Sequence, residues 1–188
     1  MKRLSTFHSI MASLGSSKDA IVRIFNTLGI KDYLFVGGLS TIYHGYARTT
    51  HDIDIIVSTD TFDKIFENET LIRENGFEFG TEGQLHFEDG TDVEFLIEGA
   101  PFVKDPTRSV PMLKDLERDE DVNFPNLETF FRSKAQRGNI KDIADIVEVL
   151  KYKKLSETEQ IQILEKMSRD DRSYRNFKRA LEVLKEEI

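Results

Sequence analysis

The spacing of apolar residues changes in character about halfway along the chain. In the first half, short apolar runs alternate with helical patterns, and glycines separate them. Apolar residues three and four positions apart predict helices, whereas short runs rich in Ile, Val and Phe predict strands. The predicted helices cover residues 17–28, 39–46 and 61–75, and the predicted strands cover 33–36, 52–57, 77–79, 84–87 and 92–97.

The order of these elements predicts the fold class. Turns at 80–83 and 88–91 join the last three strands, which indicates successive antiparallel pairing. Residues 101–126 contain four prolines and are predicted as a loop. We therefore expect an α+β protein, in which a mixed or antiparallel sheet flanked by helices fills residues 1–100 and a C-terminal helical region fills 127–188. The helices predicted in that region cover 127–137, 140–152, 157–167 and 172–187.

The last predicted helix carries an apolar stripe with intervals of three and four residues. Two interpretations stay open, because the stripe suits packing on other helices of the chain or a dimer contact. Its positions are Tyr174, Phe177, Leu181, Leu184 and Ile188.

Composition and charge exclude several classes of protein. No apolar run reaches the ~20 residues of a membrane span. The chain has no Cys, which excludes disulfide scaffolds and cysteine catalysis and fits a cytoplasmic protein. Polar residues interrupt the stretch after the first Met, so we expect no signal peptide. The net charge of -8 opposes non-specific attraction to nucleic acid. The basic residues near the C-terminus form either a local strip for nucleic acid or a solvated helix face, and they are Arg169, Arg172, Arg175, Lys178 and Arg179.

Two acids in the strand 52–57 form the first candidate site. Side chains two positions apart in a strand point to the same side, so Asp52 and Asp54 lie roughly 7 Å apart and repel each other. Mg²⁺ suits such a pair, because it takes one or two carboxylates together with phosphate oxygens and water. Glu94 supplies a third carboxylate, preferred over Asp92 because it lies within its apolar run. The structural alternatives are turn chemistry for the pair and an exposed sheet edge for Glu94.

Gly37 and Gly38 end the strand 33–36 and begin the next helix. Such a bend presents backbone N–H groups at a helix N-terminus, an anion-binding geometry, and Ser40 adds a hydroxyl in the first turn. The glycine patterns of P-loops and of dinucleotide folds are absent from the sequence. Asp52 follows fourteen positions after Gly38, so the sequence predicts a phosphate cradle beside paired acids.

This combination resembles the polymerase-β-like nucleotidyltransferase superfamily. That signature has a strand ending in Gly-Gly or Gly-Ser, a short helix, an Asp-x-Asp strand and a third carboxylate on a later strand. A segment similar to the Lys…Lys-Asp-x-x-Asp helices of the stand-alone bacterial branch, which includes abortive-infection toxins, runs from Pro125 to Asp145. The resemblance covers roughly residues 20–150, with Glu rather than the commoner Asp as third acid and Ser40 where Ala is frequent. The matching residues are Val36-Gly37-Gly38-Leu39-Ser40, Arg48-x-Thr50-x-Asp52-Ile53-Asp54 and Val93-Glu94-Phe95.

The resemblance implies an enzyme that moves an NMP from an NTP to an acceptor hydroxyl. It implies that two Mg²⁺ ions are held by three acids, Asp52, Asp54 and Glu94. It also implies that the nucleotide is bound by Gly37, Gly38, Ser40, Arg48 and Lys134. The expected acceptor is tRNA, a protein or a small molecule, with tRNA first, and the toxin-like branch adds a cognate antitoxin as partner. An antibiotic nucleotidyltransferase and a non-catalytic module that binds a nucleotide or a partner are the alternatives.

Structural roles stay open for the charged residues of the helical segment. Lys134 lies near the buried face of its helix and either reaches the triphosphate or extends from the edge of that face. Asp142 and Asp145 brace the site or serve the helix alone, and Lys141 with Asp145 has the spacing of a surface ion pair. Arg48 either contacts the substrate or pairs with neighbouring acids.

Overall fold

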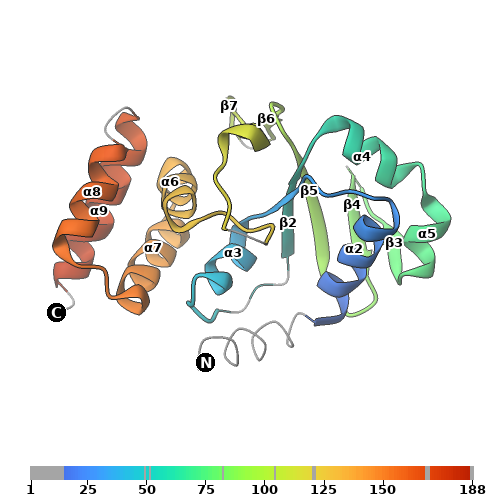
Figure 1. Ribbon diagram of the computed structural model, residues 1–188, viewed down its shortest axis with the longest axis horizontal. Coiled ribbons are helices and arrows are strands. Elements are labelled where there is room, and N and C mark those ends of the chain that lie inside the picture. The colour runs from blue at the N-terminus through green and yellow to red at the C-terminus, as the bar shows by residue number, and fades with distance from the viewer. Residues whose placement is uncertain are drawn as a thin grey trace.

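The computed structural model describes residues 15–48, 50, 52–81, 83–103, 105–119, 122–167 and 170–186. Over these residues the protein is α+β, as predicted, with a sheet and its helices at one end and a group of helices at the other (Figure 1). The elements of the first half are α2 (Gly15–Thr27), β1 (Leu34–Phe35), α3 (Gly37–Tyr43), β2 (Asp52–Val57), α4 (Thr59–Phe66), α5 (Glu69–Glu74), β3 (Phe77–Phe79), β4 (Gln84–Phe87) and β5 (Asp92–Ile97). Those that follow are β6 (Pro101–Phe102), β7 (Asp105–Ser109), the 3-10 helix η1 (Leu113–Asp115), α6 (Leu127–Arg137), α7 (Ile140–Lys153), α8 (Glu157–Lys166) and α9 (Asp171–Glu186).

Two predictions of secondary structure were wrong. The single helix predicted over 61–75 is divided into α4 and α5, because Asn68 leaves helical geometry and its side-chain amide donates to Lys64 O at 2.8 Å. The loop predicted over 101–126 contains the antiparallel β6–β7 hairpin and η1. Strands as short as β6 carry too few residues for an alternating pattern, so the prolines dominated the prediction.

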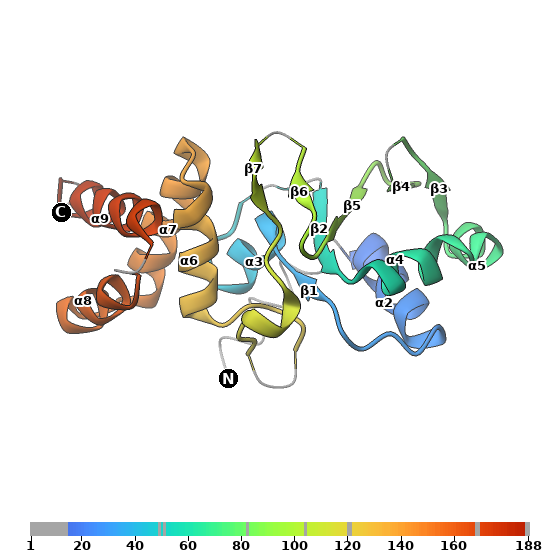
Figure 2. The same cartoon turned by 90° about the horizontal axis from the view of Figure 1, so that it is seen from above.

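The β6–β7 hairpin lies between the sheet and the C-terminal helices. Seen from above, it lies between α6 on one side and β2 and β5 on the other (Figure 2). Val110 and Leu113, which follow it, pack with Leu34 and Ile56 in a small apolar cluster. The hairpin is therefore anchored on the sheet while it faces α6.

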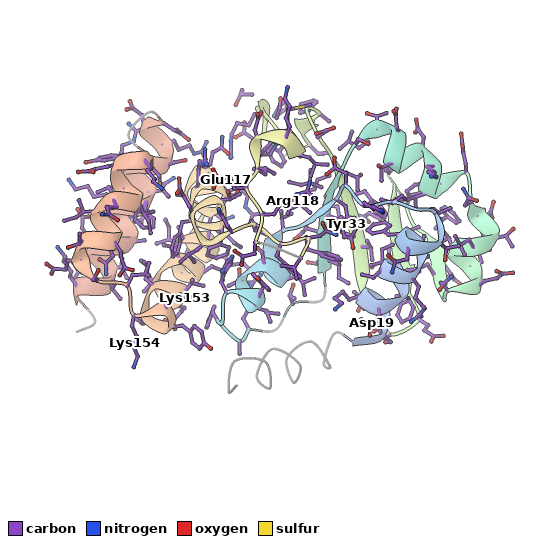
Figure 3. All side chains as sticks on the ribbon, viewed as in Figure 1. Asp19, Tyr33, Glu117, Arg118, Lys153 and Lys154 are labelled. Carbon is purple, nitrogen blue, oxygen red and sulfur yellow. The ribbon has the colours of Figure 1, made fainter. Side chains whose placement is uncertain are left out.

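The segment between η1 and α6 ties the two halves together. Arg118 forms an ion pair with Asp32 and donates to Asn123 Oδ1 at 3.3 Å. The backbone N–H of Phe35 in β1 donates to Asn123 O at 2.8 Å, which extends the hydrogen bonding at this edge of the sheet. Figure 3 shows Arg118 and Glu117 in this segment, between α6 and the sheet.

The sheet has the order β1-β2-β5-β4-β3 and is mixed. Strand β2 runs antiparallel to β1 and parallel to β5, whereas β5 with β4 and β4 with β3 are antiparallel, as predicted for the last three strands. In the parallel register Asp52 lies opposite Asp92, and Asp54 lies opposite Glu94. These four acids share one face, because paired residues of neighbouring strands point the same way.

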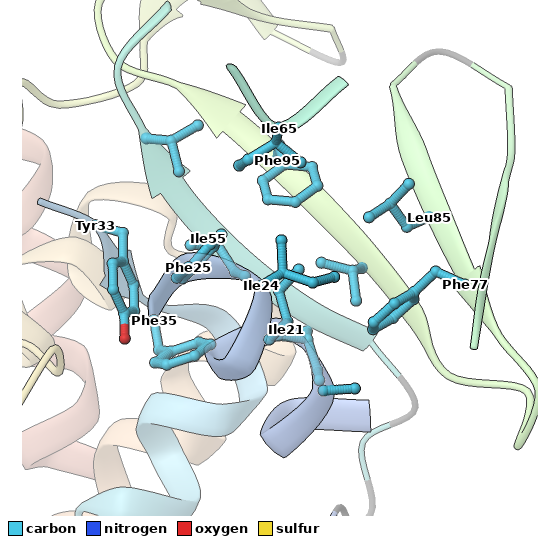
Figure 4. Packing of buried hydrophobic residues seen from close by; sticks show 14 of the residues in the cluster. Ile21, Ile24, Phe25, Tyr33, Phe35, Ile55, Ile65, Phe77, Leu85 and Phe95 are labelled. Atoms are coloured by element: carbon cyan, nitrogen blue, oxygen red, sulfur yellow. The ribbon is translucent and has the colours of Figure 1, made fainter. Parts of the chain in front are cut away.

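The opposite face of the sheet forms the main core. Ile53, Ile55 and Val93 are fully buried, and with Phe95 they pack against apolar side chains of α2, α4 and α5 (Figure 4). Burial of one face only explains why β2 and β5 alternate between apolar and acidic residues.

The C-terminal helices form a second core. On α9, Phe177 and Leu184 are buried in it with Phe131 of α6 and Ile146 of α7. The apolar stripe therefore packs against other helices of the same chain. The dimer contact stays a prediction, but the buried residues of this stripe are not available to form it. Ile188 lies outside the described residues, as does Arg169.

Helix α9 also closes the C-terminal end of α6. Arg172 Nη2 donates to Arg137 O at 3.0 Å, and Asn176 Nδ2 donates to Ala135 O at 2.8 Å. These carbonyls belong to the last turn of α6, where helical partners are missing. Gly138 caps the helix in left-handed geometry (φ 63°), and a methyl group there would lie 1.9 Å from Asn176 Nδ2. Among the described residues no helix is long and apolar enough to cross a membrane.

Candidate active site

The structure brings the three predicted carboxylates onto one face of two adjacent strands. Asp54 on β2 and Glu94 on β5 are direct neighbours in the parallel register, and Asp52 lies on the same face as Asp54. Neighbouring strands lie about 5 Å apart, so the Asp54 and Glu94 side chains project side by side. Glu94 and Asp52 are exposed and Asp54 is half-buried. The three carboxylates therefore offer oxygen ligands that range from half-buried to exposed.

The Gly-Gly bend lies directly against Asp54. Gly37 has φ 60°, and a methyl group there would lie 1.6 Å from Asp54 Oδ2. The backbone N–H of Val36 donates to Asp54 O at 2.9 Å, so the bend is also bonded to β2. A methyl group on Gly38 would lie 2.6 Å from Arg48 Nη2 and 2.5 Å from Thr50 Oγ1. Both glycines are therefore required for close approach, one to the acid and one to the arginine.

Charges of both signs surround Asp54 and act on its pKa in opposite directions. Burial raises the pKa of Asp54, and the negative charge of Asp52 raises it further. The positive charges of Arg137, Lys134 and Arg48 act in the opposite direction. The carboxylate at the centre of the site is thus held among cations that come from other parts of the chain.

Lys134 is buried rather than directed at the open site. Its Nζ donates to Asp145 Oδ2 at 2.7 Å and lies 3.5 Å from Asp142 Oδ1. Lys134 as a whole residue is 3% exposed. Burial lowers its pKa, against the opposing effect of Asp145. Two carboxylates contact the ammonium group, and Lys134 also lines the smaller cavity that adjoins the cleft described below, so the predicted contact with the triphosphate stays a prediction.

Asp145 joins three elements instead of forming the surface pair expected with Lys141. It is 2% exposed and accepts a hydrogen bond from Thr41 Oγ1 at 3.2 Å, besides that from Lys134. Arg48 Nε lies 3.5 Å from its other oxygen. The bracing role considered for Asp145 is therefore the one that the contacts support, and Arg48 pairs with an acid.

The Ser40 side chain is hydrogen-bonded to the backbone of its own helix, α3. Its hydroxyl donates to Gly37 O at 2.9 Å and the side chain is 2% exposed. Ser40 also lines the smaller cavity that adjoins the cleft described below, and the phosphate contact predicted for it stays a prediction.

A cleft of about 580 Å³ lies beside the acids. Its lining includes Asp54 and Glu94 from the sheet, together with arginines from the hairpin, from the end of α6 and from α9. Ligand sites in proteins have volumes of about 300–1,000 Å³, so the cleft suits a nucleotide-sized molecule. The lining arginines are Arg108, Arg137 and Arg172.

Sequence reasoning missed Arg108 and Arg137 and treated Arg172 only as part of an outer strip. Arg108 lies in the segment predicted as a loop. Arg137 follows Lys134 by three positions, so the two share a helix face, and this spacing was the one available signal. A smaller, mainly apolar cavity of about 60 Å³ adjoins the cleft and shares Arg108 and Arg137 with it.

The donor set fits a hard divalent ion. Among the described residues no three His, Asp or Glu side chains form a ready-made metal site. Mg²⁺, however, is usually bound by one or two carboxylates, with substrate phosphates and water as the other ligands. Asp54 beside Glu94 provides these two carboxylates. No protein-family model matches the chain, and no curated protein matches it.

Proposed function

We propose that this chain is a Mg²⁺-dependent nucleotidyltransferase, which moves an NMP from an NTP to an acceptor hydroxyl. One observation carries the proposal. Asp54 and Glu94 project side by side from paired strands into a cleft whose lining includes three arginines, and the Gly37 bend lies against Asp54. The resemblance to the polymerase-β-like superfamily supports the same reaction.

Each part of the site has a role in this reaction. Asp54 and Glu94 are the residues that would hold Mg²⁺, and Asp52 on the same face is the third carboxylate that the resemblance implies. When bound, the ion neutralises phosphate charge and lowers the pKa of the attacking hydroxyl. The Gly37 backbone fixes the Asp54 carboxylate, which restricts its orientation. The acceptor oxygen bonds to the α-phosphorus, the bond to the β-phosphate oxygen breaks, and pyrophosphate leaves. The hydroxyl proton passes to the exposed carboxylate of Glu94.

The acceptor follows from the resemblance to abortive-infection toxins. We propose tRNA first, and a protein or a small molecule such as an antibiotic as the other acceptors, with a cognate antitoxin as regulator. We also propose a cytoplasmic location, since the chain has no Cys. On α9, Arg175, Lys178 and Arg179 are exposed, which supports contact with a polyanionic acceptor.

Two observations favour a non-catalytic nucleotide-binding module as the second candidate. In the part of the chain that the structure describes, no three acids stand together as a ready-made metal site, and Lys134 is neutralised internally. Such a module would bind an NTP in the cleft without transferring the nucleotidyl group.

The test incubates the protein with each α-labelled NTP, Mg²⁺, and either total tRNA or cell extract. Asp54→Asn and Glu94→Gln are compared with Glu78→Gln, which changes an exposed acid on β3. We expect labelled acceptor with wild type and Glu78→Gln, and a loss of about 10²-fold or more with the other two variants. Equal background labelling by wild type and Asp54→Asn, together with thermal stabilisation by NTP, would establish the module instead.

A further inference from the structure

Three arginines from distant parts of the chain meet at the cleft. Arg108 lies on β7, Arg137 is the last residue of α6, and Arg172 lies in the first turn of α9. Their side chains are between about one-sixth and one-half exposed, so each guanidinium is reachable from the cleft. The motifs discussed above assign no role to Arg108 or Arg137.

The three guanidinium groups are held in place by neighbouring atoms. Arg137 donates to both carboxylate oxygens of Asp142, at 3.1 and 2.5 Å. Arg172 donates to Arg137 O at 3.0 Å. Arg108 lies over the Phe102 ring, 5.6 Å from its centroid. Each arginine is thus oriented before any ligand arrives, which reduces the entropic cost of binding an anion.

One carboxylate oxygen lies between two of these arginines. Asp105 Oδ2 is 3.8 Å from Arg108 Nη1 and 3.8 Å from Arg172 Nη1. Both separations exceed hydrogen-bonding distance, so the contacts are electrostatic. Burial lowers the pKa of Arg108, and the charges of Arg172 and Arg137 lower it further, against the raising effects of Asp105 and Asp170. Two like charges face this carboxylate, which also accepts a hydrogen bond from Thr107 Oγ1 at 2.6 Å, and a more strongly charged anion would compete with it for the two arginines.

We propose that Arg108, Arg137 and Arg172 bind the β- and γ-phosphates of a nucleoside triphosphate, and that Asp105 is the anion that these phosphates displace. This inference rests on the proposed function and names the phosphate-binding part of that site. Arg108 and Arg172 can bind phosphate oxygens in bidentate fashion, whereas Arg137 donates from Nε and Nη2 to Asp142 and offers its Nη1.

The geometry favours a triphosphate over the backbone of an RNA. The arginines converge from three elements on one cleft of about 580 Å³, instead of following a surface strip. Asp54 and Glu94 line the same cleft, so a triphosphate with its tail on the arginines has its α-phosphate near the acids. Lys134 is engaged by Asp142 and Asp145, so other cations must balance the phosphate charge.

The experiment measures binding of inorganic tripolyphosphate by calorimetry, in EDTA and without divalent ions, so that the acids and Mg²⁺ do not contribute. Arg108→Gln and Arg172→Gln are compared with Arg175→Gln, the same change at an exposed site of α9. Arg137 is left intact because Asp142 depends on it. We expect each cleft variant to raise Kd about tenfold, as for loss of charge-assisted hydrogen bonds, and the control to retain the wild-type Kd.

Asp105→Asn provides a test of opposite sign. Removing the competing carboxylate is expected to lower the Kd for tripolyphosphate about threefold or more, whereas Asp63→Asn on the exposed face of α4 leaves it unchanged. Wild-type Kd values for both cleft arginine variants, or equal weakening by Arg175→Gln, would overturn the proposal. Binding of a single-stranded RNA oligomer that depends on Arg108 and Arg172, with no binding of tripolyphosphate, would also overturn it.

Transfer assays separate this inference from the proposed function. If the arginine variants lose tripolyphosphate binding and wild type labels no acceptor, the phosphate site stands and the transferase assignment fails. If wild type and Arg172→Gln transfer label with the same KM for NTP, the transferase stands and the phosphate site fails.

Discussion

Gly37 is the residue on which the shape of the site depends most directly. Its left-handed backbone (φ 60°) is unfavourable for any residue with a side chain, and Asp54 Oδ2 lies where a methyl group would be. Gly29 has nearly the same backbone angle (φ 66°) with open space around it. The two glycines therefore separate the cost of the backbone angle from the cost of the collision.

Alanine at each glycine tests this separation. We expect Gly29→Ala to lower the free energy of unfolding by about 1–2 kcal/mol, the cost of left-handed geometry. Gly37→Ala should cost clearly more, because it must also displace the Asp54 carboxylate, and it should abolish nucleotidyl transfer. Urea unfolding at neutral pH measures both. Equal losses of stability would show that Asp54 moves aside freely.

His44 predicts how stability depends on pH. The ring is 1% exposed, and its Nε2 lies 3.0 Å from Pro125 O. Burial lowers the pKa of His44 to about 4, and the charge of Lys153, at the end of α7 in Figure 3, lowers it too, against smaller raising effects of Pro125 and Asp119. The folded protein therefore keeps His44 neutral over a range in which the unfolded chain protonates it.

Above pH 6.5 His44 is neutral in the folded and the unfolded chain, so it does not reduce the free energy of unfolding. As pH falls from 6.5 to about 4, the unfolded chain takes up a proton that the folded protein does not, and the free energy of unfolding decreases. The loss reaches about 3 kcal/mol. We expect His44→Gln to remove this part of the acid sensitivity, so that its free energy of unfolding falls less between pH 6.5 and 4. Denaturation curves at several pH values measure the slope, and an unchanged slope in the variant would contradict this account.

At the scale of elements, Asp145 connects α3, α6 and α7. It accepts from Thr41 on α3 and from Lys134 on α6, and both partners are buried with it. Breaking a buried ion pair by removing one partner leaves an uncompensated charge, which costs about 3–5 kcal/mol. The helix that begins at the Gly-Gly bend is thus joined to the C-terminal helices by the hydrogen bond from Thr41 to the Asp145 carboxylate, which also pairs with Lys134.

A double-mutant cycle tests this connection. We expect Lys134→Met to lower the free energy of unfolding by about 3–5 kcal/mol, and Lys134→Met with Asp145→Leu to recover part of that loss. Lys151→Met, which removes the cation of a surface pair with Glu148 on α7, should cost less than about 1 kcal/mol. If Lys134→Met costs no more than this control, the network does not hold the helices together.

Most elements could be predicted because their signals are local. The alternation in 52–57 and 92–97 places Asp54 and Glu94 on solvent-facing sides of their strands, whatever the partner strands are. Parallel pairing in the register that joins Asp54 to Glu94 is not local, because it depends on the crossover through α4, α5 and the β3–β4 hairpin. The convergence of the acids was therefore inferred from a resemblance and not from periodicity.

The arginines that line the cleft could not be predicted for a related reason. A solvated arginine and a cleft arginine look alike in sequence, and Arg108, Arg137 and Arg172 meet only after the hairpin and α9 have packed. Lys134 is the opposite case. The sequence indicated a possible contact with substrate, but the carboxylates that pair with it lie on the next helix. Spacing gives the face of a helix, but the partner on that face is a tertiary property.

At the scale of the molecule, the two ends of the protein contribute opposite charges to one cleft. The sheet provides the acids, and the segments after it provide the arginines. Acids gathered without a cation repel one another, so a divalent ion that joins them stabilises the folded state by mass action.

Mg²⁺ alone should therefore raise Tm. At a concentration ten times its Kd it adds about 1.4 kcal/mol, or about 3 °C for a chain of this size. We expect the rise in wild type and in Glu78→Gln, and its absence in Asp54→Asn, measured by calorimetry with EDTA as the metal-free reference. A rise of the same size in Asp54→Asn would place the ion elsewhere.

The position of α9 has a consequence for folding during synthesis on the ribosome. Arg172 enters the cleft from a helix that the ribosome makes after every other part of its lining. The sheet and its carboxylates can fold earlier, since domains form progressively as they emerge. During synthesis the nascent chain therefore carries its acids before the last of the cleft arginines, so the proposed phosphate site would be completed only when α9 has been made.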